Sequence, residues 1–332
     1  MTTLVIGGAG FIGSALISKL IKNNNNTEIV VIDKLSLGSI DNLNESSISF
    51  YHEDINSFDT IIKILKNHSS IHEVWHLAAN SDIPAGISDV EIDLKDTFLS
   101  TVSTLKVMEK IGCKKLYFSS SSAIYGPHDK KLNEDTGPLL PISNYGAMKL
   151  ASESIISAYY ESYLEMVSIF RFPNVVGLPA THGVILDFIR RLKESSDNLN
   201  VFGNGTQKKI YIHINELIDA MLFINSNAKN GFNYFNIGPD DDGVTVKDIA
   251  EKTVARVSPN ATINYGIENR GWVGDIPNFS YSVEKLKNIG YKVKNSSLDA
   301  VLKAIKDFQL SRVISFHSRV KSARDFSNEF TD

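Results

Sequence analysis

A glycine-rich turn close to the N-terminus constrains the fold more than any other feature of this sequence. Residues 7–13 read GGAGFIG and hold four glycines in seven positions. The apolar residues 3–6 before the turn predict a short buried strand, and residues 11–22 after it predict a helix. A strand, a glycine turn and a helix in this order are typical of a site where the backbone comes close to a bound phosphate.

An acidic residue at the end of the next predicted strand indicates which kind of phosphate ligand binds there. Residues 8–13 have the spacing Gly-x-Gly-x-x-Gly, and Asp33 lies twenty residues beyond Gly13, at the end of the apolar segment 28–33. This combination is the fingerprint of dinucleotide binding, in which the acid binds the ribose hydroxyls. Because a carboxylate repels a 2′-phosphate, Asp33 favours NAD over NADP, and Lys34 beside it weakens that preference slightly.

Apolar strands and helices alternate over the first half of the chain. Further strands are predicted at residues 50–54, 73–78, 115–119 and 166–170, and further helices at 58–66, 93–110 and 145–162. The alternation predicts an α/β fold with a Rossmann-type, doubly wound parallel sheet as the NAD-binding domain, residues 1–172.

The second half of the chain is less regular. Residues 173–310 are rich in Gly, Pro and Asn, which indicates a smaller, mixed C-terminal lobe that binds the substrate. A segment near 210–240 is expected to return to the first domain. Residues 311–332 have weak periodicity and are expected to form a C-terminal tail at the surface.

The bulk composition excludes several classes of function. A net charge of −4 leaves no basic footprint for nucleic acid, and no run reaches the 18 apolar residues that a membrane span needs. The single cysteine, Cys113, rules out an internal disulfide, and no cluster has metal-ligand spacing. The N-terminus lacks the cationic leader of a signal peptide. We therefore expect a cytoplasmic protein that binds no metal, membrane or nucleic acid.

A tyrosine and a lysine suggest the chemistry of the site. Tyr145 and Lys149 lie four residues apart and share one face of a predicted helix. A lysine ammonium near the phenol would lower the tyrosine pKa from its free value of about 10. The preceding FSSSSAIYG (118–126) puts four serines at the carboxyl end of a strand, where such sheets bind ligands. We predict a catalytic set completed by either Ser121 or Ser122.

Taken together, these motifs resemble the extended short-chain dehydrogenase/reductase family, and within it the nucleotide-sugar epimerases of the archaeal UDP-glucose 4-epimerase type. The resemblance extends to about residue 310 and also rests on HLAAN (76–80), RFPNVVG (171–177), THGVILDFI (181–189), FGNGTQKKIYI (202–212) and GWVGDIP (271–277). It implies interconversion of UDP-glucose and UDP-galactose through a transient 4-keto sugar, with NAD bound throughout. It also implies a homodimer formed through the helical segments 93–110 and 145–162.

The resemblance further implies which residues bind each ligand. Those expected at the cofactor mostly follow the carboxyl ends of strands: Gly7, Gly10, Phe11, Ile12, Gly13, Asp33, Lys34, Asp54, Ile55, Leu77, Ala78, Ala79, Ser119, Tyr145, Lys149 and Phe172. Those expected at the sugar nucleotide come from the serine segment, the catalytic helix and the second half of the chain: Ser121, Ser122, Tyr145, Asn174, His182, Gly183, Val184, Lys209, Tyr211, Arg270 and Asp275.

Four positions depart from the family pattern. Thr97 stands where relatives often carry an asparagine, Met148 where they usually carry a serine, and Lys209 where many carry an arginine that forks onto a phosphate. Trp272 stands where many carry an arginine, three residues before Asp275, so Arg270 is a candidate for that contact. At Thr97 we expect an altered cofactor contact. At Lys209 we expect weaker diphosphate binding, because lysine offers a point charge without bidentate geometry.

Other NAD-dependent enzymes of sugar nucleotides are the alternatives. A 4,6-dehydratase needs an Asp-Glu pair just before the YG of the serine segment, and a UDP-glucuronate decarboxylase has an acid there, whereas this chain has Ser122 and Ala123. Epimerisation of UDP-N-acetylglucosamine or a UDP-uronate stays open, as does a 4-keto reductase, although Asp33 disfavours NADPH. A non-catalytic NAD-binding scaffold would have lost its catalytic residues, and Ser121, Tyr145 and Lys149 are all present.

Overall fold

A parallel sheet of seven strands forms the centre of the larger lobe. The computed structural model describes residues 1–332 except 24–26, 44–46, 129, 270–275, 277 and 312–332. The sheet consists of β1 (Thr2–Ile6), β2 (Glu28–Asp33), β3 (Ser49–His52), β4 (Ile71–His76), β5 (Lys115–Ser121), β6 (Met166–Phe172) and β11 (Gly231–Asn236). Its order is β11-β6-β5-β4-β1-β2-β3, so the strand order reverses between β1 and β4. Sheets of this kind bind ligands outside the carboxyl ends of their strands at such a reversal, and the Rossmann-type α/β fold is confirmed.

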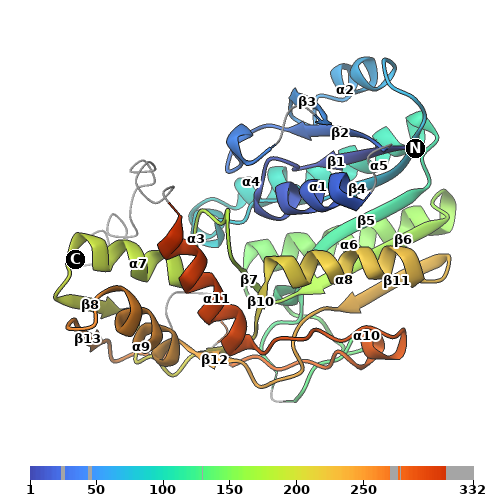
Figure 1. The fold of residues 1–332 in the computed structure, drawn as a ribbon. Coiled ribbons are helices and arrows are strands. Elements are labelled where there is room, and N and C mark those ends of the chain that lie inside the picture. Colours follow the sequence, from blue (N-terminus) through green and yellow to red (C-terminus); the bar gives the residue numbers. More distant parts are fainter. Residues whose placement is uncertain (24–26, 44–46, 129, 270–275, 277, 312–332) are drawn as a thin grey trace.

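Helices cover both faces of this sheet (Figure 1). On one face, α1 (Phe11–Asn23) and α8 (Ile214–Asn227) pack on strand residues that include Val5 and Trp75. On the other face, α2 (Phe58–Leu65), α5 (Ser100–Ile111) and α6 (Asn144–Ser162) pack on a set that includes Leu4 and Val74. Neighbouring residues of one strand point to opposite faces, which is why the central strands β1 and β2 are buried along almost their whole length.

The helix expected over residues 93–110 is interrupted. The chain forms α3 (Ile83–Ser88) and α4 (Val90–Asp93), then a π-helical segment η3 (Leu94–Leu99), and only then α5. Hydroxyl groups of Ser100 and Thr101 donate to the carbonyl oxygens of Asp96 and Thr97, at 2.8 and 2.9 Å. Such side-chain bonds to a preceding carbonyl compete with the regular helical pattern, and wide turns of this type are frequent at functional sites.

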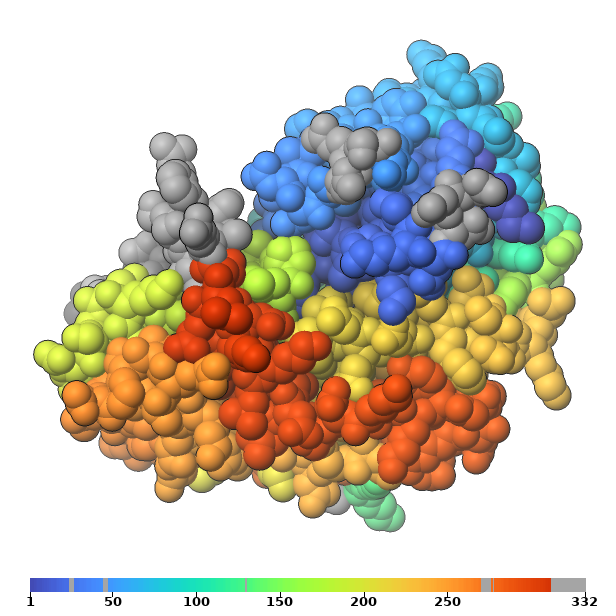
Figure 2. Space-filling view, viewed as in Figure 1, coloured from blue at the N-terminus to red at the C-terminus, as the bar shows by residue number. Residues whose placement is uncertain are grey.

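The smaller lobe has a hydrophobic core of its own. Helices α7 (Val184–Glu194), α9 (Val246–Val257) and α11 (Ser297–Leu310) pack around the paired strands β8 (Asn198–Val201) and β13 (Thr262–Tyr265). In the space-filling view these segments lie together on one side of the molecule, away from the blue N-terminal segments (Figure 2). None of the described helices is long and apolar enough to cross a membrane.

Short elements complete the fold. In the larger lobe, η1 (Ile40–Asn42) lies between β2 and β3, and η4 (Ser122–Ile124) follows β5. Later in the chain come β7 (Asn174–Val176), β9 (Lys208–Lys209), β10 (Tyr211–His213), β12 (Val244–Thr245) and α10 (Glu284–Asn288). Strand β7 follows β6 directly and pairs in parallel with β10, while β9 pairs with β12 in antiparallel register. After β10, helix α8 and strand β11 bring the chain back to the central sheet, where β11 pairs with β6.

Candidate active site

The glycine turn after β1 packs directly on the backbone that follows β4. Gly7 has a φ of +81°, and a Cβ atom added to it would lie 2.5 Å from the backbone nitrogen of Ala78. A Cβ on Gly13 would lie 2.2 Å from the carbonyl oxygen of Gly7. Only glycine fits at these two positions. Helix α1 begins at Phe11, so its first N–H groups lie at the turn, where helices bind phosphates.

The carboxylate of Asp33 is fixed beside this turn. Its Oδ2 accepts a hydrogen bond from the Ala9 backbone N–H at 2.9 Å, and its Oδ1 accepts one from the Leu35 N–H at 2.8 Å. Burial raises the pKa of Asp33, and the backbone bonds, which favour the charged form, oppose that rise. The first N–H groups of α1 can bind a pyrophosphate, and the fixed carboxylate of Asp33 can bind a ribose. Together they fit a dinucleotide.

The other residues expected at the cofactor also lie at the carboxyl edge of the sheet. Strand β3 ends at His52 and β4 at His76, so Asp54, Ile55, Leu77, Ala78 and Ala79 fall just beyond the strands rather than inside them. Lys34 follows β2, and its Nζ lies 4.0 Å from Oδ2 of Asp54. Phe172 is the last residue of β6 and pairs with Ser121 of β5. The structure thus brings this set to one edge.

The predicted catalytic residues meet where α6 packs against the end of β5. Ser143 caps α6 by accepting a hydrogen bond from the Gly146 N–H, which fixes where the helix starts. Lys149 is 2% exposed, and its Nζ donates to the carbonyl oxygen of Ser119 at 2.5 Å. The same Nζ lies 5.9 Å from the centre of the Tyr145 ring. The Ser121 side chain accepts a hydrogen bond from the Ala123 N–H and acts on Tyr145 by favouring a lower pKa of its phenol, whereas Ser122 begins the short helix η4.

Burial stabilises the neutral forms of Tyr145 and Lys149, the two predicted catalytic residues on α6. It raises the pKa of Tyr145 to about 12, against the hydrogen bond with Ser121. It lowers the pKa of Lys149 to about 7, against the negative charges of Glu153 and Asp93. Tyr145 is therefore a neutral phenol at pH 7 in this state. It needs further positive charge beside it before it can act as a base.

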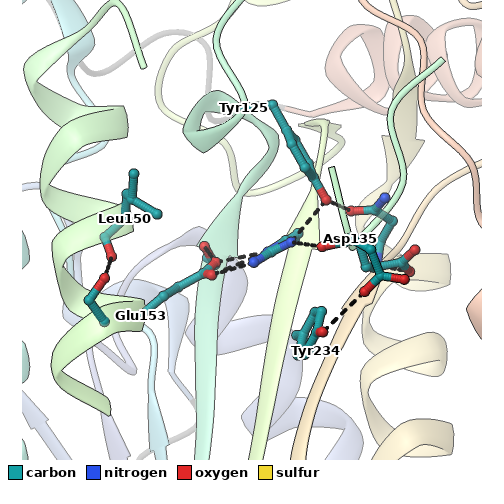
Figure 3. A network of polar contacts seen from close by, with 10 residues as sticks. Tyr125, Asp135, Leu150, Glu153 and Tyr234 are labelled. Carbon is teal, nitrogen blue, oxygen red and sulfur yellow. Dashed lines mark hydrogen bonds and ion pairs between the residues drawn. The ribbon is translucent and has the colours of Figure 1, made fainter. Parts of the chain in front are cut away.

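A buried network behind the catalytic residues joins α6 to β5 and β6 (Figure 3). The Arg171 guanidinium on β6 donates to Glu153 on α6, with Nη2 and Oε2 2.7 Å apart. It also donates to the Tyr125 hydroxyl at 3.1 Å, and the Ser120 hydroxyl donates to Glu153. Glu153 lies one helical turn after Lys149, so this network holds the face of α6 that carries the lysine. Sequence reasoning did not identify Glu153 or its pairing with Arg171.

A second buried group lies on the other side of Lys149. Asp93 is fully buried, and its Oδ1 accepts a hydrogen bond from the Asn80 side-chain amide at 3.0 Å. The backbone N–H of Asn80 donates to the Thr97 hydroxyl at 3.1 Å. Thr97, the position that departs from relatives, therefore holds the main chain after β4. The HLAAN motif was the available signal for Asn80, but only Leu77, Ala78 and Ala79 of this motif were predicted as ligands.

The residues expected at the sugar nucleotide come from the short elements and the smaller lobe. Asn174 on β7 lies opposite Tyr211 on β10, and Lys209 is two residues before Tyr211. The Asn174 amide donates to the Ile210 carbonyl at 3.5 Å. The structure therefore brings Asn174, Lys209 and Tyr211 together at the end of β6.

The remaining predicted residues lie around the start of α7. His182 and Gly183 are exposed, and Gly183, with a φ of +119°, directly precedes Val184, where the helix begins. Arg270 and Asp275 lie outside the described residues.

Comparison with known proteins places this site within a family. The model of the NAD dependent epimerase/dehydratase family matches residues 3–238. A putative UDP-glucose 4-epimerase of Methanocaldococcus jannaschii is 31% identical over 66% of this chain and 72% of its own. The UDP-glucose 4-epimerase of Lactobacillus helveticus is also 31% identical, over 72% of this chain and 76% of its own.

A solved structure agrees over almost the whole chain. The UDP-glucose 4-epimerase of Thermotoga maritima, determined with UDP-glucose, superposes with a TM-score of 0.82 at 28% identity. The match covers 93% of this chain and 99% of that one.

The glycine turn, Asp33 and the family match agree on NAD as the cofactor. The chain belongs to the NAD dependent epimerase/dehydratase family, and with its sugar-nucleotide relatives to the extended short-chain dehydrogenases/reductases.

Proposed function

We propose that this protein is a UDP-sugar 4-epimerase that interconverts UDP-glucose and UDP-galactose. The observation that carries the proposal is the set formed by Ser121, Tyr145 and Lys149 at the carboxyl end of β5. The ammonium of the buried Lys149 lies 5.9 Å from the centre of the Tyr145 ring, and the Ser121 side chain favours a lower pKa of that phenol. A scaffold that only bound NAD would have no use for a buried lysine directed at a tyrosine.

The residues divide the chemistry at the sugar 4-position. NAD, when bound, would supply reversible oxidation of that carbon. Tyr145 takes the proton of the 4-hydroxyl in the forward half of the cycle and returns it in the second half. Ser121, rather than Ser122, orients the reacting oxygen, because its hydroxyl already contacts the phenol. Lys149 supplies positive charge near the phenolate and holds its own position through Ser119.

The sugar nucleotide would be held from the opposite side of the site. Asn174, whose strand pairs with that of Tyr211, and Lys209 offer an amide and a cation for the diphosphate. His182, Gly183 and Val184 at the start of α7 would complete the cleft. Inversion at the 4-position requires the 4-keto sugar to turn over between the two halves of the cycle. Tight contacts to the diphosphate and loose contacts to the sugar would permit this.

We also propose that the protein is a cytoplasmic homodimer. The segments α4 and η3, beside α6, carry three exposed apolar side chains, Val90, Leu94 and Leu99, which are 47%, 37% and 41% exposed. Apolar groups gathered on one surface favour burial against a second copy. Light scattering should give the mass of two chains, and Leu94→Glu with Leu99→Glu should give the mass of one. A monomeric wild-type protein would contradict the proposal.

The proposed reaction is tested by incubating the purified protein with UDP-galactose and following the products by proton NMR. We expect UDP-glucose to accumulate, and the same equilibrium mixture to form from UDP-glucose. Parallel reactions with UDP-N-acetylglucosamine and UDP-glucuronate compare the other open substrates. Absence of conversion with all four substrates, in protein shown by extraction to contain NAD, would refute a 4-epimerase.

A further inference from the structure

Lys34, the residue after the ribose-binding acid, is engaged by two carboxylates from other parts of the chain. Its Nζ lies 2.5 Å from Oδ1 of Asp96 and 4.0 Å from Oδ2 of Asp54. The side chain of Lys34 is 31% exposed and that of Asp96 is 19% exposed, so water screens this pair only in part. Asp96 belongs to η3, the π-helical segment that interrupts the expected helix.

A lysine at this position has a consequence for cofactor choice. Dinucleotide sites of this fold bind a free ribose through the strand-ending acid and accept a 2′-phosphate where a cation lies nearby. Lys34 directly follows Asp33 at the end of β2, so a free ammonium there would attract a phosphate. In the structure that ammonium is instead bonded to Asp96.

The charge around the ribose position is therefore negative. Asp33, Asp54 and Asp96 contribute three carboxylates, and Lys34 contributes one ammonium. His52, whose Nε2 lies 3.2 Å from the Lys34 carbonyl oxygen, and Asp93, whose pKa the charge of Asp96 helps to raise, are further ionisable neighbours. A doubly negative phosphate placed beside these acids would be repelled, whereas two hydroxyl groups would not.

We propose that Asp96 is a cofactor-specificity residue, which rejects NADP by holding Lys34 away from the ribose 2′-position and by adding negative charge there. Selection of NAD then depends on two acids from separate elements, Asp33 on β2 and Asp96 on η3. The π-helical turn contributes by presenting Asp96 to Lys34 while Thr97, the next residue, bonds to the Asn80 N–H. This inference rests on dinucleotide binding and not on the identity of the sugar.

The proposal is tested by the dissociation constants of NAD⁺ and NADP⁺ for nucleotide-free protein, measured by titration calorimetry. Asp96→Asn keeps the size of the side chain and removes its charge. We expect it to lower the ratio of the NADP⁺ constant to the NAD⁺ constant by about tenfold, mainly through tighter NADP⁺ binding. The gain should shrink as salt is added, because it depends on the exposed charge of Lys34.

Lys34→Met provides the matched control. Relative to Lys34→Met alone, the double variant with Lys34→Met and Asp96→Asn should change the ratio by much less than tenfold, because no cation remains to meet the phosphate and only the charge of Asp96 is removed. Equal weakening of both nucleotides by Asp96→Asn would show that Asp96 only supports the fold. An unchanged ratio would overturn the proposal as well. A thermal melt of each variant confirms that it is folded, and the nucleotide extracted from each freshly purified variant gives a second reading of the same preference.

Discussion

The two sides of the site differ in how their polar side chains are supported. The side that carries Ser121, Tyr145 and Lys149, called here the catalytic wall, is formed by strand β5 and the 19-residue helix α6. The Arg171–Glu153 network is buried behind it. The side that carries Asn174, Lys209 and Tyr211, called here the lobe wall, is formed by the short strands β7, β9 and β10, of two or three residues each. Asn174 on that wall is exposed.

This difference matches what the proposed reaction asks of each wall. Proton transfer needs a phenol and a hydroxyl held in a fixed geometry, which a buried and bonded wall supplies. A sugar that turns over needs a partner surface that binds the diphosphate and leaves the sugar ring free. Substitutions in the catalytic wall should therefore reduce kcat or stability, and substitutions in the lobe wall should mainly raise KM.

The largest effect is expected on stability, behind the catalytic wall. Arg171→Met leaves the charge of Glu153 buried without its partner, and we expect a loss of about 3–5 kcal/mol in the free energy of unfolding. Urea unfolding followed by circular dichroism measures this loss. Lys114→Met breaks the exposed pair with Glu165, at 2.7 Å, and should change little. An Arg171→Met variant as stable as wild type would show that the network does not brace this wall.

The next effect concerns the choice between the two serines. Ser121→Ala removes the hydroxyl that contacts Tyr145, and we expect kcat to fall about 100-fold. Ser122→Ala is the matched control, because Ser122 lies one residue further along, in η4, and should stay within a few-fold of wild type. Initial rates of UDP-galactose conversion measure both. If the larger loss occurs in Ser122→Ala, the assignment of Ser121 is wrong.

On the lobe wall the expected loss is smaller and lies in binding. Lys209→Met removes a cation proposed to meet the diphosphate, and we expect KM to rise about tenfold with kcat nearly unchanged. Lys208→Met is a matched control, because successive side chains of a strand point to opposite sides. A fall in kcat at constant KM for Lys209→Met would remove the distinction between the walls.

A further effect is a pH dependence of stability at Lys149. Burial lowers its folded pKa to about 7, below the value of about 10.4 for a free lysine. Between these two pH values Lys149 is protonated in the unfolded chain and largely neutral in the folded protein. Its contribution therefore makes the free energy of unfolding rise with pH, by at most about 1.4 kcal/mol per pH unit. Lys149→Met should remove that rise, as measured by urea unfolding of nucleotide-free protein at pH 7 and pH 9. An identical slope in both proteins would contradict this.

Local patterns in the sequence were sufficient to predict the sheet and the catalytic helix. Apolar runs ending in polar residues located all six strands expected in the first half, and the glycine spacing located the turn after β1. The Tyr145 and Lys149 spacing predicted their shared helix face, because helical geometry fixes which neighbours align.

Contacts between distant residues could not be predicted in this way. Nothing in the local sequence links Lys34 to Asp96 or Arg171 to Glu153, since each pair meets only when separate elements pack. The expected helix over 93–110 is present, but its π-helical turn over Leu94–Leu99 could not be predicted, for a related reason. Its hydroxyl-bearing residues bond to carbonyl groups and to the Asn80 backbone, which widens one turn without changing the apolar periodicity.

The central claim is that Tyr145 performs proton transfer on the catalytic wall, while the diphosphate of the sugar nucleotide is bound by the lobe wall. It is tested most directly by steady-state kinetics of UDP-galactose conversion by Tyr145→Phe, with Tyr160→Phe on the same helix as control. We expect kcat to fall about 1,000-fold with KM and NAD content close to wild type, and Tyr160→Phe to retain full activity. A Tyr145→Phe variant that keeps more than about a tenth of wild-type kcat would contradict the account.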